Sequence, residues 1–107
     1  MEAPKLKDIY QNLIVVNRTT FDGGEYDVAF HVLMAALHCG HSLKEIPYLL
    51  EVEQIAAVEL AWIDSHHPEY EHSTQSAAKR GHQSIFYALG VQANATVALM
   101  KSAQITS

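Results

Sequence analysis

The chain has 107 residues, of which 49% are hydrophobic and 18% charged, with seven Lys or Arg against twelve Asp or Glu. This length and apolar content predict one domain, over residues 1–107, with a core of its own. The formal net charge of −5 argues against nucleic-acid binding, which would need a basic patch. The apolar runs fall short of the roughly 20 residues that a membrane span needs, and no signal peptide is visible, so we expect a cytoplasmic protein with no membrane contact.

The first half of the chain predicts two helices separated by a glycine turn. Leu6, Ile9 and Leu13 recur at helical spacing, which predicts a first helix from about Pro4 to Arg18. The segment 19–24, which ends in Asp-Gly-Gly, should break it. A second helix is expected from about residue 22 or 24 to Cys39, with Gly40 as its C-terminal cap.

The second half predicts two more helices. Ser42 and Glu45 have the spacing of a capping box, while Pro47 indicates a kinked start or a helix that begins at the proline itself. This third helix should end near Asp64. A long fourth helix is expected over about 69–103, with weak points at Gly81 and Gly90 where it can be broken. Short connections then favour a compact, antiparallel, all-α fold resembling a four-helix bundle.

One polar stripe stands out on the second helix, which is otherwise almost wholly apolar. At 100° per residue its members fall within roughly 80° of arc; they are Asp27, His31, Met34, His38 and His41. Two interpretations are open. The stripe is either the only solvent-facing strip of a buried helix, or the lining of a polar seam that faces another helix.

Two residues on other helices are candidates for the far side of such a seam. His82 falls inside an apolar stripe of the predicted last helix, where it is either a core histidine with one hydrogen-bond partner or a seam residue. Glu59 borders the apolar face of the third helix. The candidate ligand-binding seam therefore comprises Asp27, His31, His38, Glu59 and His82.

The same histidines are candidate ligands for a divalent transition metal. His31 and His38 are two turns apart, roughly 10 Å along the axis, so they cannot share an ion unaided. The closer pairs are His38 with His41 and Asp27 with His31. Glu69 and His72 form one Glu-x-x-His motif, which is similar to the motif that ferritin-like di-iron proteins carry on two helices. The candidate metal ligands are His31, His38, His41, Glu69, His72 and His82.

A second apolar stripe on the third helix suggests a subunit interface. Tyr48, Ile55 and Trp62 repeat every seven residues, about 100° away from that helix's main apolar face. Tyr and Trp are enriched in protein interfaces, so a homodimer is expected through this stripe. The alternative is that the stripe packs against the first or the last helix.

These observations favour a small interaction or ligand-binding protein over an enzyme. The sequence contains no nucleophile elbow and no phosphate-binding glycine loop. The expected partners are a second copy of the chain or another protein. The alternative is a metal-dependent enzyme, or a metal or pH sensor, built on histidines and carboxylates. Protonation of all seven histidines would move the formal charge from −5 to +2, which suits a pH sensor.

Overall fold

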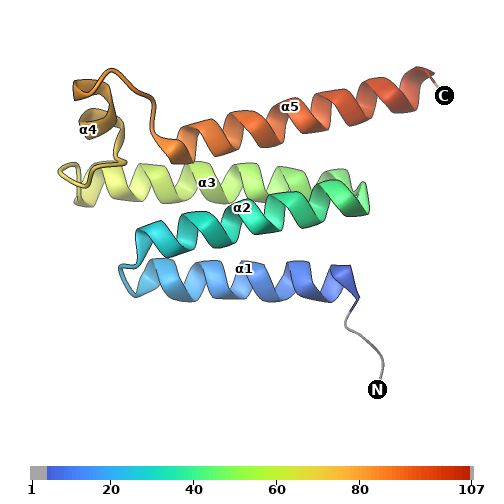
Figure 1. The fold of residues 1–107 in the computed structure, drawn as a ribbon, viewed down its shortest axis with the longest axis horizontal. Helices are drawn as coiled ribbons and strands as arrows, with labels where there is room; N and C mark the ends of the chain where they lie inside the picture. The colour runs from blue at the N-terminus through green and yellow to red at the C-terminus, as the bar shows by residue number, and fades with distance from the viewer. Residues whose placement is uncertain (1–4, 107) are drawn as a thin grey trace.

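Five helices and no strand make up residues 5–106, which is the part of the chain that the computed structural model describes (Figure 1). They are α1 (Leu6–Asp22), α2 (Tyr26–Leu43), α3 (Ile46–His66), α4 (Thr74–Lys79) and α5 (Ile85–Thr106). The four long helices alternate in direction along the chain. The predicted all-α fold with antiparallel neighbours is confirmed.

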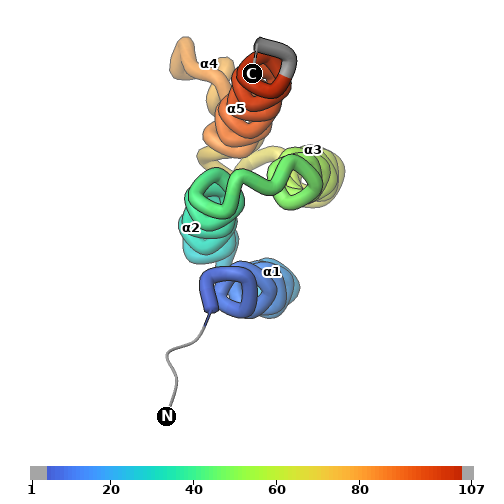
Figure 2. Tube along the Cα trace, turned by 90° about the vertical axis from the view of Figure 1, so that its right-hand side faces the viewer, coloured from blue at the N-terminus to red at the C-terminus, as the bar shows by residue number. Residues whose placement is uncertain are grey.

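The helices α2 and α3 form the middle of the molecule. In Figure 2 they lie beside one another, with α1 on one side of the pair and α5 on the other. The most extensive contacts are those of α1 with α2 and of α3 with α5. The outer helices α1 and α5 are therefore held together through the central pair.

The core lies between the central pair and α5, with one large contribution from α1. Tyr10 of α1 is fully buried, and α2 contributes Phe30, Leu33 and Leu37. The remaining core comes from α3 and α5, whose buried apolar residues are Leu49, Val52, Ala56, Ile63, Phe86, Leu89, Ala93 and Val97. Within each helix their spacing of three, four or seven residues is the helical periodicity that the sequence shows.

The first helix is longer than predicted, because it continues through Asp22 instead of ending at Arg18. The hydroxyls of Thr19 and Thr20 donate to the carbonyls of Val15 and Val16 at 3.0 and 2.8 Å, so these residues satisfy their polar groups within the helix. The turn itself falls at the expected glycines. Gly24 has φ +83°, a conformation that favours glycine over other residues.

Gly40 does not cap the second helix, so that prediction is wrong. It is buried within α2, which continues to Leu43, and the cap is Lys44 in the left-handed conformation with φ 56°. A Cβ at Gly40 would lie 3.3 Å from Cβ of Tyr48. The glycine therefore permits close approach of α2 and α3. The capping box is also wrong, since Ser42 lies inside α2 and α3 begins at Ile46 with Pro47 in its first turn.

The predicted last helix is broken at Gly81, one of its two expected weak points. Gly81 has φ +76° and separates α4 from α5, whereas Gly90 lies inside α5. The segments 69–73 and 80–84 are connections, which corrects the expected continuous helix. Ser84 stabilises the second connection, because its hydroxyl donates to the carbonyl of His72 at 2.6 Å and accepts from the Phe86 amide at 3.2 Å.

Candidate functional site

The histidine stripe of α2 faces solvent. His31, His38 and His41 are all exposed, while Met34 is half-buried against the core. The structure therefore matches the first interpretation of the stripe. Asp27 is also exposed, and the Tyr70 hydroxyl donates to its carboxylate, which joins the stripe to the connection between α3 and α4.

The two residues expected across the seam are not brought to the stripe. His82 lies in the connection between α4 and α5 and is exposed. Glu59 is 6% exposed and faces α1, where Asn17 Nδ2 donates to its Oε1 at 3.4 Å. Burial, partly offset by this hydrogen bond, raises the pKa of Glu59 to about 7. Asn17 also donates to the Ala29 carbonyl at 2.9 Å, so this side chain of α1 links α1 to both α2 and α3.

The second stripe of α3 packs toward α1. The ring of Tyr48 stacks on that of Tyr10 with centroids 4.3 Å apart, and Trp62 meets Phe21 edge-on at 5.7 Å. Ile55 is half-buried against the core. This packing is the alternative that the sequence left open for the stripe. A contribution of Trp62, which is 39% exposed, to a dimer interface stays a prediction.

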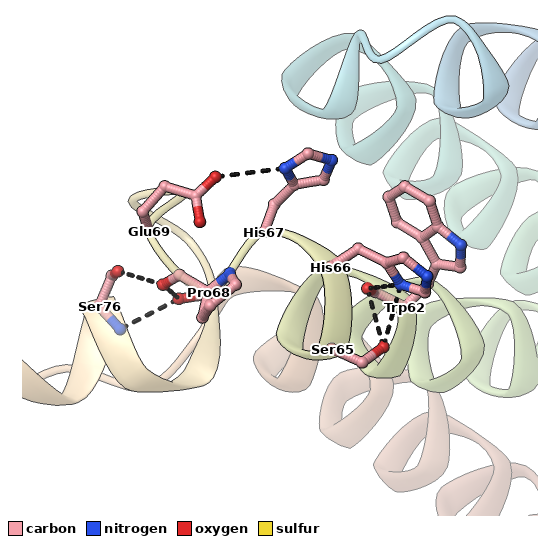
Figure 3. A network of polar contacts seen from close by, with 8 residues as sticks. Trp62, Ser65, His66, His67, Pro68, Glu69 and Ser76 are labelled. Carbon is pink, nitrogen blue, oxygen red and sulfur yellow. Dashed lines mark hydrogen bonds and ion pairs between the residues drawn. The ribbon is translucent and has the colours of Figure 1, made fainter.

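An aromatic cluster, the aromatic corner, lies where the α1–α2 turn meets the C-terminal end of α3. Its members are Phe21, Tyr26, Trp62, His66, His67 and Tyr70. The rings of His66 and Trp62 lie against one another (Figure 3) and are stacked, with their centroids 4.3 Å apart and their planes 11° apart. Sequence reasoning missed this cluster. Its signal was that aromatic residues flank two predicted breaks, which alternating helix directions place at one end of the bundle.

Beside the aromatic corner lies a small open hollow, the corner hollow, of about 350 Å³. Figure 3 shows two of its residues, His67 and Glu69, whose side chains are joined at 3.2 Å. The complete lining is Gly24, Glu25, Tyr26, Asp27, His67, Glu69 and Tyr70. Burial, followed by the hydrogen bond to Asp27, raises the pKa of Tyr70, so its phenol remains a donor at neutral pH.

One group of potential metal ligands adjoins the corner hollow. Asp27, Glu71 and His72 each offer one ligand atom, and these atoms lie within 4.8 Å of one another; within residues 5–104 no other trio of His, Cys, Asp or Glu does so. The group joins Asp27 from the stripe to His72 from the Glu-x-x-His motif. Glu69 of that motif instead pairs with His67. Arg80 lies 3.8 Å from the Glu71 carboxylate and partly neutralises it.

A larger apolar groove, the α3/α5 groove, runs between α3 and α5 and has a volume of about 440 Å³. Small residues widen it, and Phe86 forms part of its buried floor. Tyr87 and Val91 on its α5 side are each 51% exposed. Its full lining is Glu53, Ala57, Leu60, Ala61, Asp64, Phe86, Tyr87, Gly90, Val91 and Asn94.

Comparison with protein-family models, curated proteins and solved structures finds no match to this chain. Within the described residues, each helix is too short or too polar to cross a bilayer. The geometry of the groove and of the corner therefore carries the functional argument.

Proposed function

We propose that this protein is an interaction module whose α3/α5 groove binds an amphipathic helical segment of a partner protein. The observation that carries the proposal is the exposed apolar lining of that groove, in which the side chains of Tyr87 and Val91 are half-exposed. Covering apolar surface releases about 25 cal/mol per Å², and an apolar groove between two helices suits the apolar face of a third.

The charges of the groove indicate the kind of helix that fits. Glu53 and Asp64 lie eleven residues apart on α3, toward opposite ends of the groove. None of the described residues that line the groove is Lys or Arg. The partner helix should therefore carry apolar residues at i, i+4 and i+7, with Lys or Arg before and after them, so that opposite charges meet at the rim.

Gly90 offers a way to close the groove without disturbing the core. A Cβ at this position would meet nothing within 4 Å, so a leucine side chain can extend into the groove. A library of displayed helical peptides, selected on the wild-type protein, should yield basic amphipathic sequences. We expect Gly90→Leu to weaken their binding at least tenfold, measured by fluorescence anisotropy of a labelled peptide.

Val15→Leu is the matched control, because Val15 is 63% exposed on α1 and lies outside the groove. Its affinity for the selected peptides should equal that of the wild type. Peptides that bind Gly90→Leu as tightly as the wild type would place the interaction elsewhere and contradict the proposal.

The homodimer that the sequence predicts would use Tyr48, Ile55 and Trp62, which lie outside the groove, but a second copy of the chain is also an alternative occupant of the groove itself. Packing two grooves face to face brings Glu53 and Asp64 of both copies together, and like charges at an interface oppose association. This supports a separate, basic partner. Light scattering distinguishes the two occupants: a wild-type dimer that Gly90→Leu converts to monomer would assign the groove to a second copy.

A divalent metal is the second candidate, and the convergence of Asp27, Glu71 and His72 supports it. One imidazole and two carboxylates form a ligand set that Zn²⁺ accepts, with room for water. Calorimetric titration of tag-free protein with Zn²⁺ should show one site that His72→Ala removes and His38→Ala leaves intact. Equal loss from both variants, or binding at His66 and His67 alone, would contradict this assignment.

A further inference from the structure

The corner hollow is a second feature of the surface, and its lining is unlike that of the α3/α5 groove. Three of its residues, Glu25, Asp27 and Glu69, carry carboxylates, and three others carry aromatic rings. It belongs to a different part of the molecule, with no lining residue in common with the groove. An inference drawn from it therefore stands independently of the proposed function.

The charge of the corner hollow is negative. Among the described residues that line it, His67 is the sole group able to become positive. Its Nδ1 lies 3.2 Å from Oε1 of Glu69. The helix dipole gives the N-terminus of α2 a partial positive charge. The C-terminus of α3, which ends at His66, carries a partial negative charge that offsets it.

Aromatic rings line the same space as these carboxylates. Tyr26 and Tyr70 meet edge to face, with centroids 5.4 Å apart, and His67 lies 6.0 Å from Tyr26. The Tyr26 ring also packs against the rings of Phe21 and Trp62, with centroids 4.9 and 6.0 Å away. The hydrogen bond from Tyr70 to Asp27 holds the second ring. The two tyrosines are therefore positioned before any ligand arrives, which lowers the entropy cost of binding.

We propose that the corner hollow is a binding site for an organic ammonium group. Carboxylates attract the charge, and the negative faces of aromatic rings favour a cation that also presents alkyl groups. A hydrated metal ion gains less from such rings, because its charge remains within a water shell. The metal ligands Glu71 and His72 lie outside the lining of the corner hollow, so only Asp27 is common to both candidate sites.

Choline and its uncharged isostere 3,3-dimethylbutan-1-ol are the probes that test this site. Amide resonances of the wild-type protein are followed by NMR during titration with each. Choline should shift Tyr26, His67 and Tyr70 in a saturable way, and added salt should weaken its binding. The uncharged isostere should shift them weakly. Equal affinity for both probes, or no saturable shift with choline, would overturn the proposal.

Two variants assign the binding to the lining of the hollow. Tyr26→Leu removes one ring, and the loss of a cation–π contact at an exposed site corresponds to roughly a two- to fivefold loss of affinity. Glu69→Gln changes only a surface side chain, so it keeps the test valid if Tyr26→Leu fails to fold. It should also weaken choline binding.

His38→Ala is the surface control, because His38 is exposed on α2 and lies outside the lining of the hollow. It should leave choline binding unchanged, whereas His72→Ala is unsuitable because the His72 ring meets that of Tyr70 with centroids 5.5 Å apart. Choline binding that survives both Tyr26→Leu and Glu69→Gln would place the ammonium elsewhere and overturn the assignment. Because the α3/α5 groove and the corner hollow have no lining residue in common, Gly90→Leu should leave choline binding intact even if it abolishes peptide binding.

Discussion

The two sides of α3 differ in how they pack: the side toward α1 makes directional hydrogen bonds, and the side toward α5 leaves an open apolar groove. On the side toward α1, polar groups of α3 accept hydrogen bonds from α1. The single Tyr10 hydroxyl proton is shared between the Tyr48 carbonyl at 3.0 Å and the Glu51 carboxylate at 2.6 Å, and Asn17 donates to Glu59. On the side toward α5, small apolar residues of α3 do not fill the space between the two helices, so the α3/α5 groove remains open. Directional hydrogen bonds specify one arrangement, whereas small apolar residues leave surface that a partner can cover.

The largest effect should come from the buried tyrosine on the α1 side. Tyr10→Ala removes a ring that is fully buried and leaves the Tyr48 carbonyl without its hydroxyl donor, so we expect a loss of about 3–5 kcal/mol in the free energy of unfolding. Urea denaturation measures it. Tyr87→Ala, at the 51% exposed tyrosine of the groove, is the matched control and should cost less than about 1 kcal/mol. Equal losses of unfolding free energy in the two variants would contradict the proposed difference between the two sides of α3.

The next effect is a pH dependence of stability that arises from Glu59 on the α1 side of α3. The pKa of Glu59 is raised to about 7 in the fold and is near 4.5 when unfolded, so the folded state binds its proton more tightly. Its stabilisation is complete below pH 4.5 and is lost as pH rises through 7, by up to about 3 kcal/mol. Glu59→Gln should remove this component.

The difference in stability between wild type and Glu59→Gln should therefore grow between pH 5 and pH 8, in favour of the variant. Chemical denaturation at a series of pH values checks this. Parallel pH profiles for the two proteins would show that Glu59 titrates normally in the fold.

Two helical glycines sharpen the comparison with a smaller effect. At Gly90 a Cβ meets nothing within 4 Å, so Gly90→Ala should stabilise the protein by roughly 0.5–1 kcal/mol through helix propensity. At Gly40 a Cβ would lie 3.3 Å from Cβ of Tyr48, so Gly40→Ala should destabilise by about 1 kcal/mol. Thermal unfolding of both variants tests the pair, and a gain at Gly40 would show that α2 and α3 can move apart.

The smallest effect is expected on the exposed stripe of α2. His31→Ala and His38→Ala should each change the free energy of unfolding by less than about 0.5 kcal/mol, since both side chains are exposed. Calorimetric unfolding at neutral pH measures the change. A loss of more than about 1 kcal/mol from either substitution would indicate that the stripe is covered, as in a subunit interface.

The features that could be predicted from the sequence are those that depend on near neighbours in the chain. Four long helical segments, the turn at Gly23 and Gly24, and a break at either Gly81 or Gly90 follow from periodicity and backbone preference. The structure contains the helices and the turn, and the break falls at Gly81. Helix ends were predicted less well. Thr19 and Thr20 continue α1 because their hydroxyls bond within it, and Gly40 stays in α2 because α3 approaches it.

The candidate site was predicted only in pieces. Asp27, Glu69 and His72 were named as candidates, but their grouping depends on how the α3–α4 connection folds back toward the start of α2. The structure joins Asp27 to Tyr70 and places His72 and Glu71 beside it. The partners Tyr26, Tyr70 and Glu71 were not predicted, since residues more than forty positions apart carry no local signal of contact.

Spacing along single segments is enough to predict that this protein is helical and which faces of its helices are apolar. It could not determine which way the α2 stripe faces, or that Glu59 is buried against Asn17. Those outcomes depend on how four amphipathic helices share their apolar faces. That arrangement, together with the α3/α5 groove and the corner hollow, forms only when the helices pack against one another.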